Sequence, residues 1–167
     1  MDQWGRLVQG GPKQKCVMPA PGAQKVTYQS LYRYTVDANR RVQMPLPWRT
    51  AKPVELTMIV WPQHECGPCL RVLPPEQLEK LREKIENMPA ADRTALKRHI
   101  GSASIKVELD SAKRIVIPAE MAEAVGIGDE AVFAGMLDYF EIWSKDRYAD
   151  MHSQEKRVVA NALKSLE

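Results

Sequence analysis

Residues 34–45 read YTVDANRRVQMP, and residues 107–118 read VELDSAKRIVIP. The two segments align without a gap at an offset of 73 residues, with charge kept at the Asp and the two basic positions and apolar residues kept at most apolar ones. The matched pairs include Asp37 and Asp110, Arg41 and Arg114, Val42 and Ile115, and Pro45 and Pro118. Self-similarity at a fixed offset indicates that one structural unit occurs twice in the chain.

Each copy has the pattern of two short strands joined by a turn. Aromatic and β-branched residues at 31–36 favour a strand, and the Asp-Ala-Asn triplet that follows favours a turn. Two more strand patterns follow the first copy, at residues 54–60 and 69–74. Similar segments follow the second copy, where EAVFAG matches ELTMIV and FEIWSKDRY matches LRVLPPEQL. The sequence therefore predicts an α+β fold built from two related β units.

Helical patterns separate the two β units and close the chain. Residues 74–88 begin with two prolines and carry leucines at helical spacing, which predicts a first helix. Residues 91–100 predict a second helix, with Asp92 as its N-cap and Gly101 as its end. Residues 153–166 predict a short amphipathic helix that packs on a neighbouring subunit.

The chain has 167 residues, with 44% hydrophobic and 27% charged residues, as in an average globular protein. No apolar run approaches the roughly 18 residues of a membrane span, so we expect a cytoplasmic protein with no membrane partner. The predicted divisions are a flexible basic tail at 1–27, a first domain with its trailing helix at 28–88, a linker helix at 89–100, a second domain at 101–151 and a helical tail at 152–167.

Charge is distributed unevenly along the chain. Residues 1–52 carry nine Lys or Arg residues against two Asp residues, whereas residues 53–167 carry fifteen basic residues against nineteen acidic ones. Such an excess of positive charge in the N-terminal third favours an anionic partner, with nucleic acid as the leading candidate. A solvated basic surface without a partner is the alternative.

The Asp and Arg residues of the repeated motif suggest two different roles. An Asp at the start of a turn can accept backbone N–H groups two residues further on, so Asp37 and Asp110 are predicted to stabilise their turns. Arg41 and Arg114 follow at a loop tip, where a guanidinium can bind a phosphate or read guanine. The alternative is that each Arg forms an ion pair with the Asp of its own turn.

Two such motifs, separated by a helical spacer and each followed by a strand-to-helix segment, resemble the MraZ family over about residues 28–151. The resemblance implies two tandem AbrB-like (SpoVT-AbrB) swapped-hairpin β units, joined by a helical hairpin and related by a pseudo-two-fold axis. It also implies a homo-oligomeric ring that binds short tandem repeats of double-stranded DNA in the promoter of the division and cell-wall gene cluster. In that family a glycine precedes the motif arginine, whereas this chain has Arg40 and Lys113, which tolerate a positive φ poorly.

The resemblance implies DNA contact by Arg41 and Arg114, which we expect nearest to the bases. Arg40, Lys113 and Arg33 are expected to meet phosphates, which set affinity and register without reading sequence. On this interpretation the protein is a nucleoid-associated regulator rather than an enzyme, with no cofactor and no small-molecule substrate. A non-specific AbrB-like nucleoid-binding protein is an alternative within the same class.

A second motif, Cys66-Gly67-Pro68-Cys69, suggests a thioredoxin-like thiol–disulfide oxidoreductase. Such an enzyme needs the cysteines at a helix N-terminus, where the helix dipole lowers the pKa of the thiol. The segment after Cys69 is instead short, apolar and strand-like, which weighs against this alternative. A zinc site formed with His64 and Cys16 is a further possibility, but the spacing is cramped, so no metal is expected.

Overall fold

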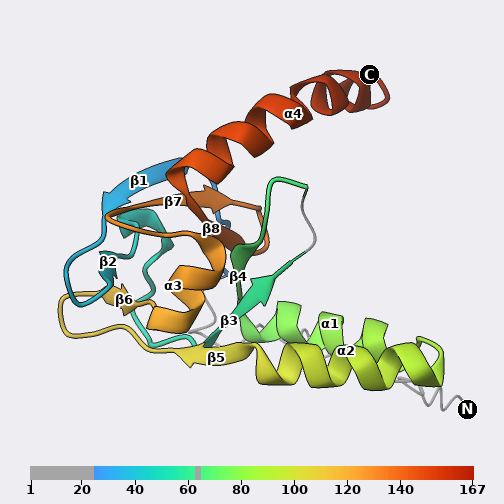
Figure 1. Ribbon diagram of the computed structural model, residues 1–167, viewed down its shortest axis with the longest axis horizontal. Helices are drawn as coiled ribbons and strands as arrows, with labels where there is room; N and C mark the ends of the chain where they lie inside the picture. Colours follow the sequence, from blue (N-terminus) through green and yellow to red (C-terminus); the bar gives the residue numbers. More distant parts are fainter. Residues whose placement is uncertain (1–24, 63–64) are drawn as a thin grey trace, which may run out of the picture.

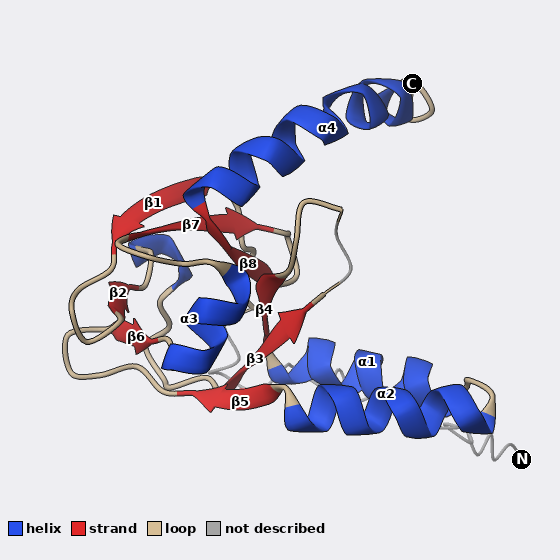
Figure 2. Ribbon diagram, viewed as in Figure 1, coloured by secondary structure: helices blue, strands red, loops and turns tan. Residues whose placement is uncertain are grey.

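The computed structural model describes residues 25–62 and 65–167 of the chain. Only the last three residues of the basic tail expected at 1–27 fall within the described part. The elements follow one another as β1 (Leu31–Thr35), β2 (Arg41–Gln43), η1 (Leu46–Trp48), β3 (Leu56–Trp61), β4 (Cys69–Leu73), α1 (Pro75–Glu86), α2 (Ala90–Ser102), β5 (Ser104–Val107), β6 (Arg114–Val116), α3 (Ala119–Val125), β7 (Glu130–Gly135), β8 (Phe140–Ser144) and α4 (Lys145–Leu163). Helices and antiparallel strands are both present (Figure 1, Figure 2), which confirms the predicted α+β class.

Strands of the two repeated units are interleaved. Six strands form one antiparallel sheet in the order β1-β7-β8-β4-β3-β5, and β2 pairs with β6 in a separate two-stranded ribbon. The first strand of each unit pairs with the third strand of the other, so that β1 lies beside β7 and β5 beside β3. Equivalent strands also pair with each other, β4 with β8 and β2 with β6. Assignment to the AbrB-like swapped-hairpin class stays a prediction, and so does the division at 28–88 and 101–151.

Side chains alternate between the two faces of the large sheet along each strand. A hydrophobic cluster covers each face. Phe133 lies in the larger hydrophobic cluster, together with Val42 and Ile115 of the β2–β6 ribbon. Its neighbour Val132 lies in a smaller cluster that includes Met151 of α4. Burial of each large apolar side chain contributes about 1.5–3 kcal/mol, so the ribbon is held against the sheet chiefly by this packing.

An aromatic group occupies the centre of the larger cluster. Trp48 is 2% exposed, and its ring centroid lies 5.0 Å from that of Phe140, 5.2 Å from Tyr32 and 5.5 Å from Tyr28. Its indole Nε1–H donates to the Gln29 carbonyl at 3.0 Å, so the polar edge of the ring is satisfied. Trp48 thereby fixes the segment between β2 and β3 to the sheet.

The connectors that follow the two turns differ. In the first unit Pro45 precedes the single 3₁₀ turn η1, whereas in the second unit Pro118 precedes the α-helix α3. Helix α3 was not predicted from the sequence, although a proline before it and a glycine after it are the usual helix boundaries. Gly126 ends α3 with a φ of 72°, a left-handed conformation that glycine adopts without steric cost.

Two helix boundaries were predicted wrongly. Helix α2 begins after Pro89 with no side-chain cap, and Asp92 lies in its first turn instead of at the N-cap. Gly101 lies inside the helix, which ends one residue later, where the chain enters β5. The helix predicted at 153–166 is the outer part of one continuous helix, α4, whose N-cap Ser144 accepts the N–H of Arg147.

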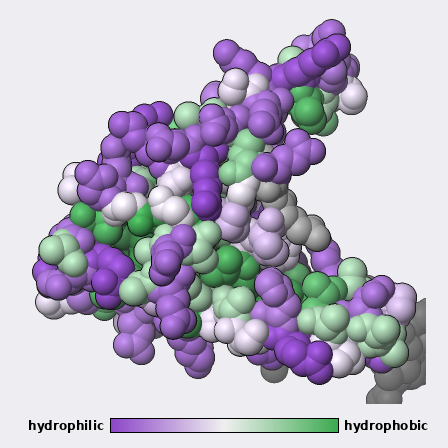
Figure 3. Space-filling view, in the orientation of Figure 1, coloured by the Kyte–Doolittle hydropathy of each residue, from purple (hydrophilic) through white to green (hydrophobic). Residues whose placement is uncertain are grey.

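Two helical arms extend from the sheet (Figure 1). Helices α1 and α2 lie side by side and are joined by an ion pair between Glu86 and Lys97. The outer end of α4 exposes Val158, Val159 and Leu163, and hydrophobic surface is visible at this end of the molecule in Figure 3. Among the described helices, none is long and apolar enough to cross a membrane.

Candidate nucleic-acid interface

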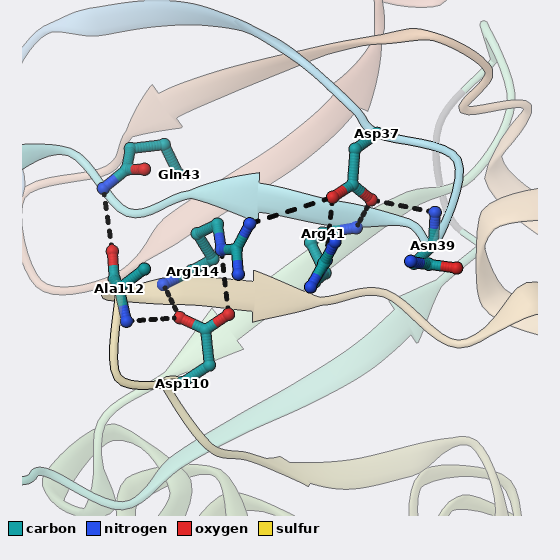
Figure 4. Close-up of polar contacts among 7 residues, drawn as sticks. All are labelled: Asp37, Asn39, Arg41, Gln43, Asp110, Ala112 and Arg114. Carbon is teal, nitrogen blue, oxygen red and sulfur yellow. Dashed lines mark hydrogen bonds and ion pairs between the residues drawn. The ribbon is translucent and has the colours of Figure 1, made fainter.

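The first motif forms a compact turn held by one carboxylate. Asp37 Oδ1 accepts the backbone N–H groups of Asn39 and Arg41, both at 2.9 Å. Asp37 Oδ2 accepts Nε–H of Arg41 at 2.7 Å (Figure 4). The backbone N–H of Arg40 donates to the Asp37 carbonyl at 2.9 Å and closes the turn. One side chain thus fixes both the backbone of the turn and the orientation of the arginine after it.

The second motif repeats this geometry almost atom for atom. Asp110 Oδ1 accepts the N–H groups of Ala112 and Arg114 at 2.9 Å, and Oδ2 accepts Arg114 Nε–H at 2.8 Å. The backbone N–H of Lys113 donates to the Asp110 carbonyl at 2.9 Å. Both arginines therefore form the ion pair that the sequence analysis left open, and the bond uses Nε instead of a terminal nitrogen.

Arg40 and Lys113 adopt the left-handed backbone conformation, with φ values of 57° and 61°. Their Cβ atoms are unfavourable there, because this region costs an L-residue about 1–2 kcal/mol. The backbone of each turn keeps the conformation that glycine favours, in spite of that cost. The strained backbone instead presents a long basic side chain at the tip of each turn.

Antiparallel pairing of β2 with β6 places the two turns at opposite ends of one short ribbon, with Arg41 opposite Val116 and Arg114 opposite Gln43 (Figure 4). Arg114 Nη1 lies 3.9 Å from Asp37 Oδ2, so its guanidinium reaches the carboxylate of the other turn. Gln43 Nε2 donates to the Ala112 carbonyl at 3.3 Å, and Arg40 Nε donates to the Ile117 carbonyl at 3.1 Å. We call residues 37–41 and 110–114 together the paired-turn surface, because these contacts join the two turns into one structure (Figure 4).

The paired-turn surface is positively charged. It carries four cations and two carboxylates, and Arg40 and Lys113 are solvent-exposed. Hydrogen bonds from the backbone N–H groups of Arg41 and Arg114, followed by those from their guanidinium groups, lower the pKa of the Asp37 and Asp110 carboxyls from the ordinary value of 3.8. The carboxylates therefore stay ionised and oriented near neutral pH, and the surplus charge belongs to the basic side chains.

Arg33 lies apart from the paired-turn surface. It is exposed on β1, where it pairs in register with Val132, whose side chain belongs to the cluster beneath α4. Burial raises the pKa of Tyr148 of α4, and the nearby positive charge of Arg33 opposes that effect. Arg33 thus lies on the face of the sheet that α4 covers, whereas the β2–β6 ribbon packs on the opposite face.

The Cys-Gly-Pro-Cys motif does not lie at a helix N-terminus. Cys69 is the first residue of β4, is 2% exposed and donates its thiol to Glu141 at 3.5 Å. Burial, followed by the charge of Glu141, raises the pKa of the Cys69 thiol far above its ordinary value, which opposes formation of a reactive thiolate. Of the four candidate zinc ligands, Cys16 and His64 lie outside the described residues.

The glycine of this motif has a structural explanation. Gly67 has a φ of 102°, and an added Cβ would lie 3.1 Å from Nε of Arg147. The same guanidinium donates from Nη1 to the Ala124 carbonyl at 3.2 Å, near the end of α3. Arg147 therefore joins the loop before β4 to the end of α3, and a side chain at position 67 would obstruct it.

Two polar residues near the turns were not singled out from the sequence. Asn39 lies exposed at the tip of the first turn, and Gln43 supports the backbone of the second turn. The repeat itself carries the signal that identifies them, because their partners in the second copy are Ala112 and Val116. Positions where two otherwise similar copies differ in chemistry distinguish one turn from the other.

The sequence is similar to those of known proteins. The family model described as "MraZ protein, putative antitoxin-like" matches residues 102–164. A protein of Acidovorax sp. (strain JS42) named "Transcriptional regulator MraZ" is 30% identical over 122 residues, which cover 72% of this chain and 84% of the relative.

Relatives from other organisms carry the same name. A protein of Hyphomonas neptunium is 28% identical over 140 residues, covering 83% of this chain and 84% of the relative. A protein of Polaromonas sp. (strain JS666 / ATCC BAA-500) is 27% identical over 131 residues, covering 78% and 91%. With a repeated Asp–Arg turn, interleaved β units and matches over most of its length, the chain belongs to the MraZ family.

Proposed function

We propose that the protein is a transcriptional regulator that binds double-stranded DNA through the paired-turn surface. The observation that carries this proposal is the placement of four basic side chains on one short two-stranded ribbon, two at each end. The major groove of B-DNA admits such a ribbon, and cations at its ends meet both phosphates and base edges. The names of the relatives support the same function.

The ion pairs within the turns support recognition instead of preventing it. Each motif carboxylate accepts Nε–H of its arginine, at 2.7 Å for Arg41 and 2.8 Å for Arg114, and so restricts the plane of the guanidinium. The terminal nitrogens, which these bonds do not use, are the donors that would meet a phosphate or guanine O6 and N7. An arginine oriented before binding loses less conformational entropy when it meets DNA.

Arg40 and Lys113 would meet phosphates on either side of the base contacts. Both are exposed at positions that a glycine would fill with less strain, so the backbone cost is offset by charge at the DNA surface. Because Arg33 lies on the face beneath α4, we leave it out of the proposed contact.

Specificity for a promoter would come from assembly. One pair of turns reads few base pairs, whereas a ring of subunits presents several pairs to tandem repeats and raises the effective concentration of each. The exposed apolar residues Val158, Val159 and Leu163 of α4 are the surface that we assign to subunit contact. We further propose that the repeats lie in the promoter of the division and cell-wall gene cluster, and that the protein is cytoplasmic, associated with the nucleoid and not an enzyme.

Replacement of Arg41 tests the proposal. Arg41→Ala should lose retention of the promoter DNA in a gel-shift assay, while gel filtration gives the wild-type assembly size. Arg33→Ala is the matched control, because it removes the same charge from the opposite face and should leave binding intact. Unchanged binding by Arg41→Ala, or equal losses in both variants, would exclude the paired-turn surface as the contact.

Salt dependence gives an independent measurement. Each phosphate contact contributes about 0.9 to the slope of log affinity against log salt, so removal of Lys113 or Arg40 should reduce the slope by that amount. Equal affinity for promoter DNA and scrambled repeats would indicate the alternative of non-specific nucleoid binding.

A further inference from the structure

The two turns share one backbone geometry but differ in the side chains that they present. Hydrogen-bond distances from the motif carboxylates agree within 0.1 Å between the copies. Four equivalent positions around the tips nonetheless carry different chemistry. The pairs are Ala38 and Ser111, Asn39 and Ala112, Arg40 and Lys113, and Gln43 and Val116.

At the strained tip position, one cation is fixed and the other is mobile. Arg40 Nε donates to the Ile117 carbonyl at 3.1 Å, which holds its guanidinium in one place. The equivalent carbonyl for Lys113 belongs to Met44, and that carbonyl accepts Nε–H of Arg49 at 3.0 Å. Within the described part of the chain, the Lys113 ammonium makes no hydrogen bond or ion pair. A guanidinium held in one place can bind a phosphate in a fixed geometry and so set the register of the first turn, whereas a mobile ammonium acts as a point charge.

At the neighbouring position, only the first turn carries a group that can read a base. The backbone N–H of Asn39 bonds to Asp37, which leaves the side-chain amide out of the turn and exposed at its tip. An Asn amide can donate to and accept from adenine N6 and N7 at once. Ala112 takes the same place in the second turn and has no polar side-chain atom.

The motif arginines are also unequal. Arg114 lies between two carboxylates, 2.8 Å from Asp110 and 3.9 Å from Asp37. Among the ion pairs of the described residues, Arg41 takes part only in the one with Asp37, at 2.7 Å. The positive charge of Arg114 is therefore more fully compensated, and Arg41 presents the stronger field to a ligand.

We propose that the two turns divide the recognition of DNA: residues 37–41 discriminate the base sequence, and residues 110–114 bind the phosphate backbone with little discrimination. This inference rests on the proposed function. Each bound subunit accordingly reads DNA asymmetrically in spite of its internal repeat, and the first turn sets the direction of the site.

A double substitution in the first turn tests the division of roles. The wild-type protein first enriches a duplex from a random-sequence library, and anisotropy then gives its affinity for that duplex and for a scrambled one. Asn39→Ala/Arg40→Lys gives the first turn the tip of the second at constant charge. It should lower the ratio of the two affinities about tenfold or more, because bidentate base contacts are lost, while affinity for the scrambled duplex changes little.

Lys113→Ala is the matched variant in the second turn. It should weaken both duplexes by the same factor and reduce the salt slope by about 0.9, so that the ratio is unchanged. All three substituted positions are exposed, and circular dichroism with gel filtration verifies the fold and assembly of both variants.

The outcomes separate the two proposals. An unchanged ratio in Asn39→Ala/Arg40→Lys, or a ratio lowered by Lys113→Ala, overturns the division of roles while DNA binding stands. Equal wild-type affinity for enriched and scrambled duplexes also overturns it, since there is then no discrimination to divide. A wild-type protein that binds neither duplex overturns the proposed function itself.

Discussion

The two repeated units agree closely at their turns and diverge immediately after them. In the first unit, a 3₁₀ turn places Trp48 in the core, whereas the second unit fills the equivalent place with α3 and its side chains Met121, Ala122 and Val125. The turn is specified by a short set of hydrogen bonds to a single Asp, so its backbone geometry is kept although the three residues between the Asp and the Arg differ. The connector needs only to supply apolar volume, which one large ring or one short helix can do.

Removal of the large ring should have the largest effect on stability. Trp48→Ala leaves a cavity among Phe140, Tyr32 and Tyr28, and we expect a loss of about 3–5 kcal/mol in the free energy of unfolding. Urea denaturation measures it, with Leu46→Ala as the control, since Leu46 is 72% exposed. A loss of stability smaller than that of Met121→Ala would mean that the connector of the second unit is the more important one.

The matching substitution in the second unit is Met121→Ala. Met121 is 8% exposed on α3, so we expect a loss of about 2 kcal/mol, at the low end of the range for buried methionine. Glu120→Ala on the exposed side of the same helix should change stability by less than about 0.5 kcal/mol. Equal losses of stability in Met121→Ala and Glu120→Ala would show that α3 contributes no apolar packing.

Two glycines on helices should respond in opposite directions. Gly126→Ala places a Cβ at a φ of 72° and 3.2 Å from Cζ of Arg147, which should cost about 1–2 kcal/mol. Gly101→Ala lies inside α2 with nothing within 4 Å of the added Cβ, and should stabilise the protein by about 0.5–1 kcal/mol. Thermal unfolding of both variants would detect a departure from these opposite signs.

Glycine at the turn tips, positions 40 and 113, should increase the stability of the protein and weaken its binding to DNA. Lys113→Gly relieves a strained φ of 61° at a cost in chain entropy, so a net gain of up to about 1 kcal/mol is expected, together with weaker DNA binding. Arg40→Gly should gain less, because it also removes the bond to the Ile117 carbonyl. A destabilised Lys113→Gly would show that the lysine supports the turn in some other way.

Acid should weaken both turns by a smaller amount, since their carboxylates are partly exposed to solvent. The pKa of Asp37 and of Asp110 is lower in the folded protein than the ordinary 3.8. Their contribution to stability is therefore complete above that value and is lost as the pH falls through the lowered pKa. Urea midpoints measured down this range should fall less steeply for Asp37→Asn/Asp110→Asn, and identical slopes would assign acid sensitivity to other groups.

Much of the fold followed from the sequence, because the repeat made each unit a guide to the other. The strands, the turns and the helical hairpin depend on local patterns of apolar spacing, Asp and Pro, which a sequence displays directly. The pairing of Asp37 with Arg114 could not be foreseen, since it depends on the register of β2 against β6. The position of Arg33 beneath α4 depends likewise on which face of β1 is covered.

The exchange of strands between units has a consequence for synthesis of the protein. The partner of β1 is β7, about a hundred residues later in the chain, and such distant contacts slow folding. While a ribosome is still making the second unit, β1 has no strand to pair with and its apolar side chains are uncovered. The first unit should therefore depend on the emergence of the second, and a nascent chain that stalls before residue 135 should be a substrate for chaperones.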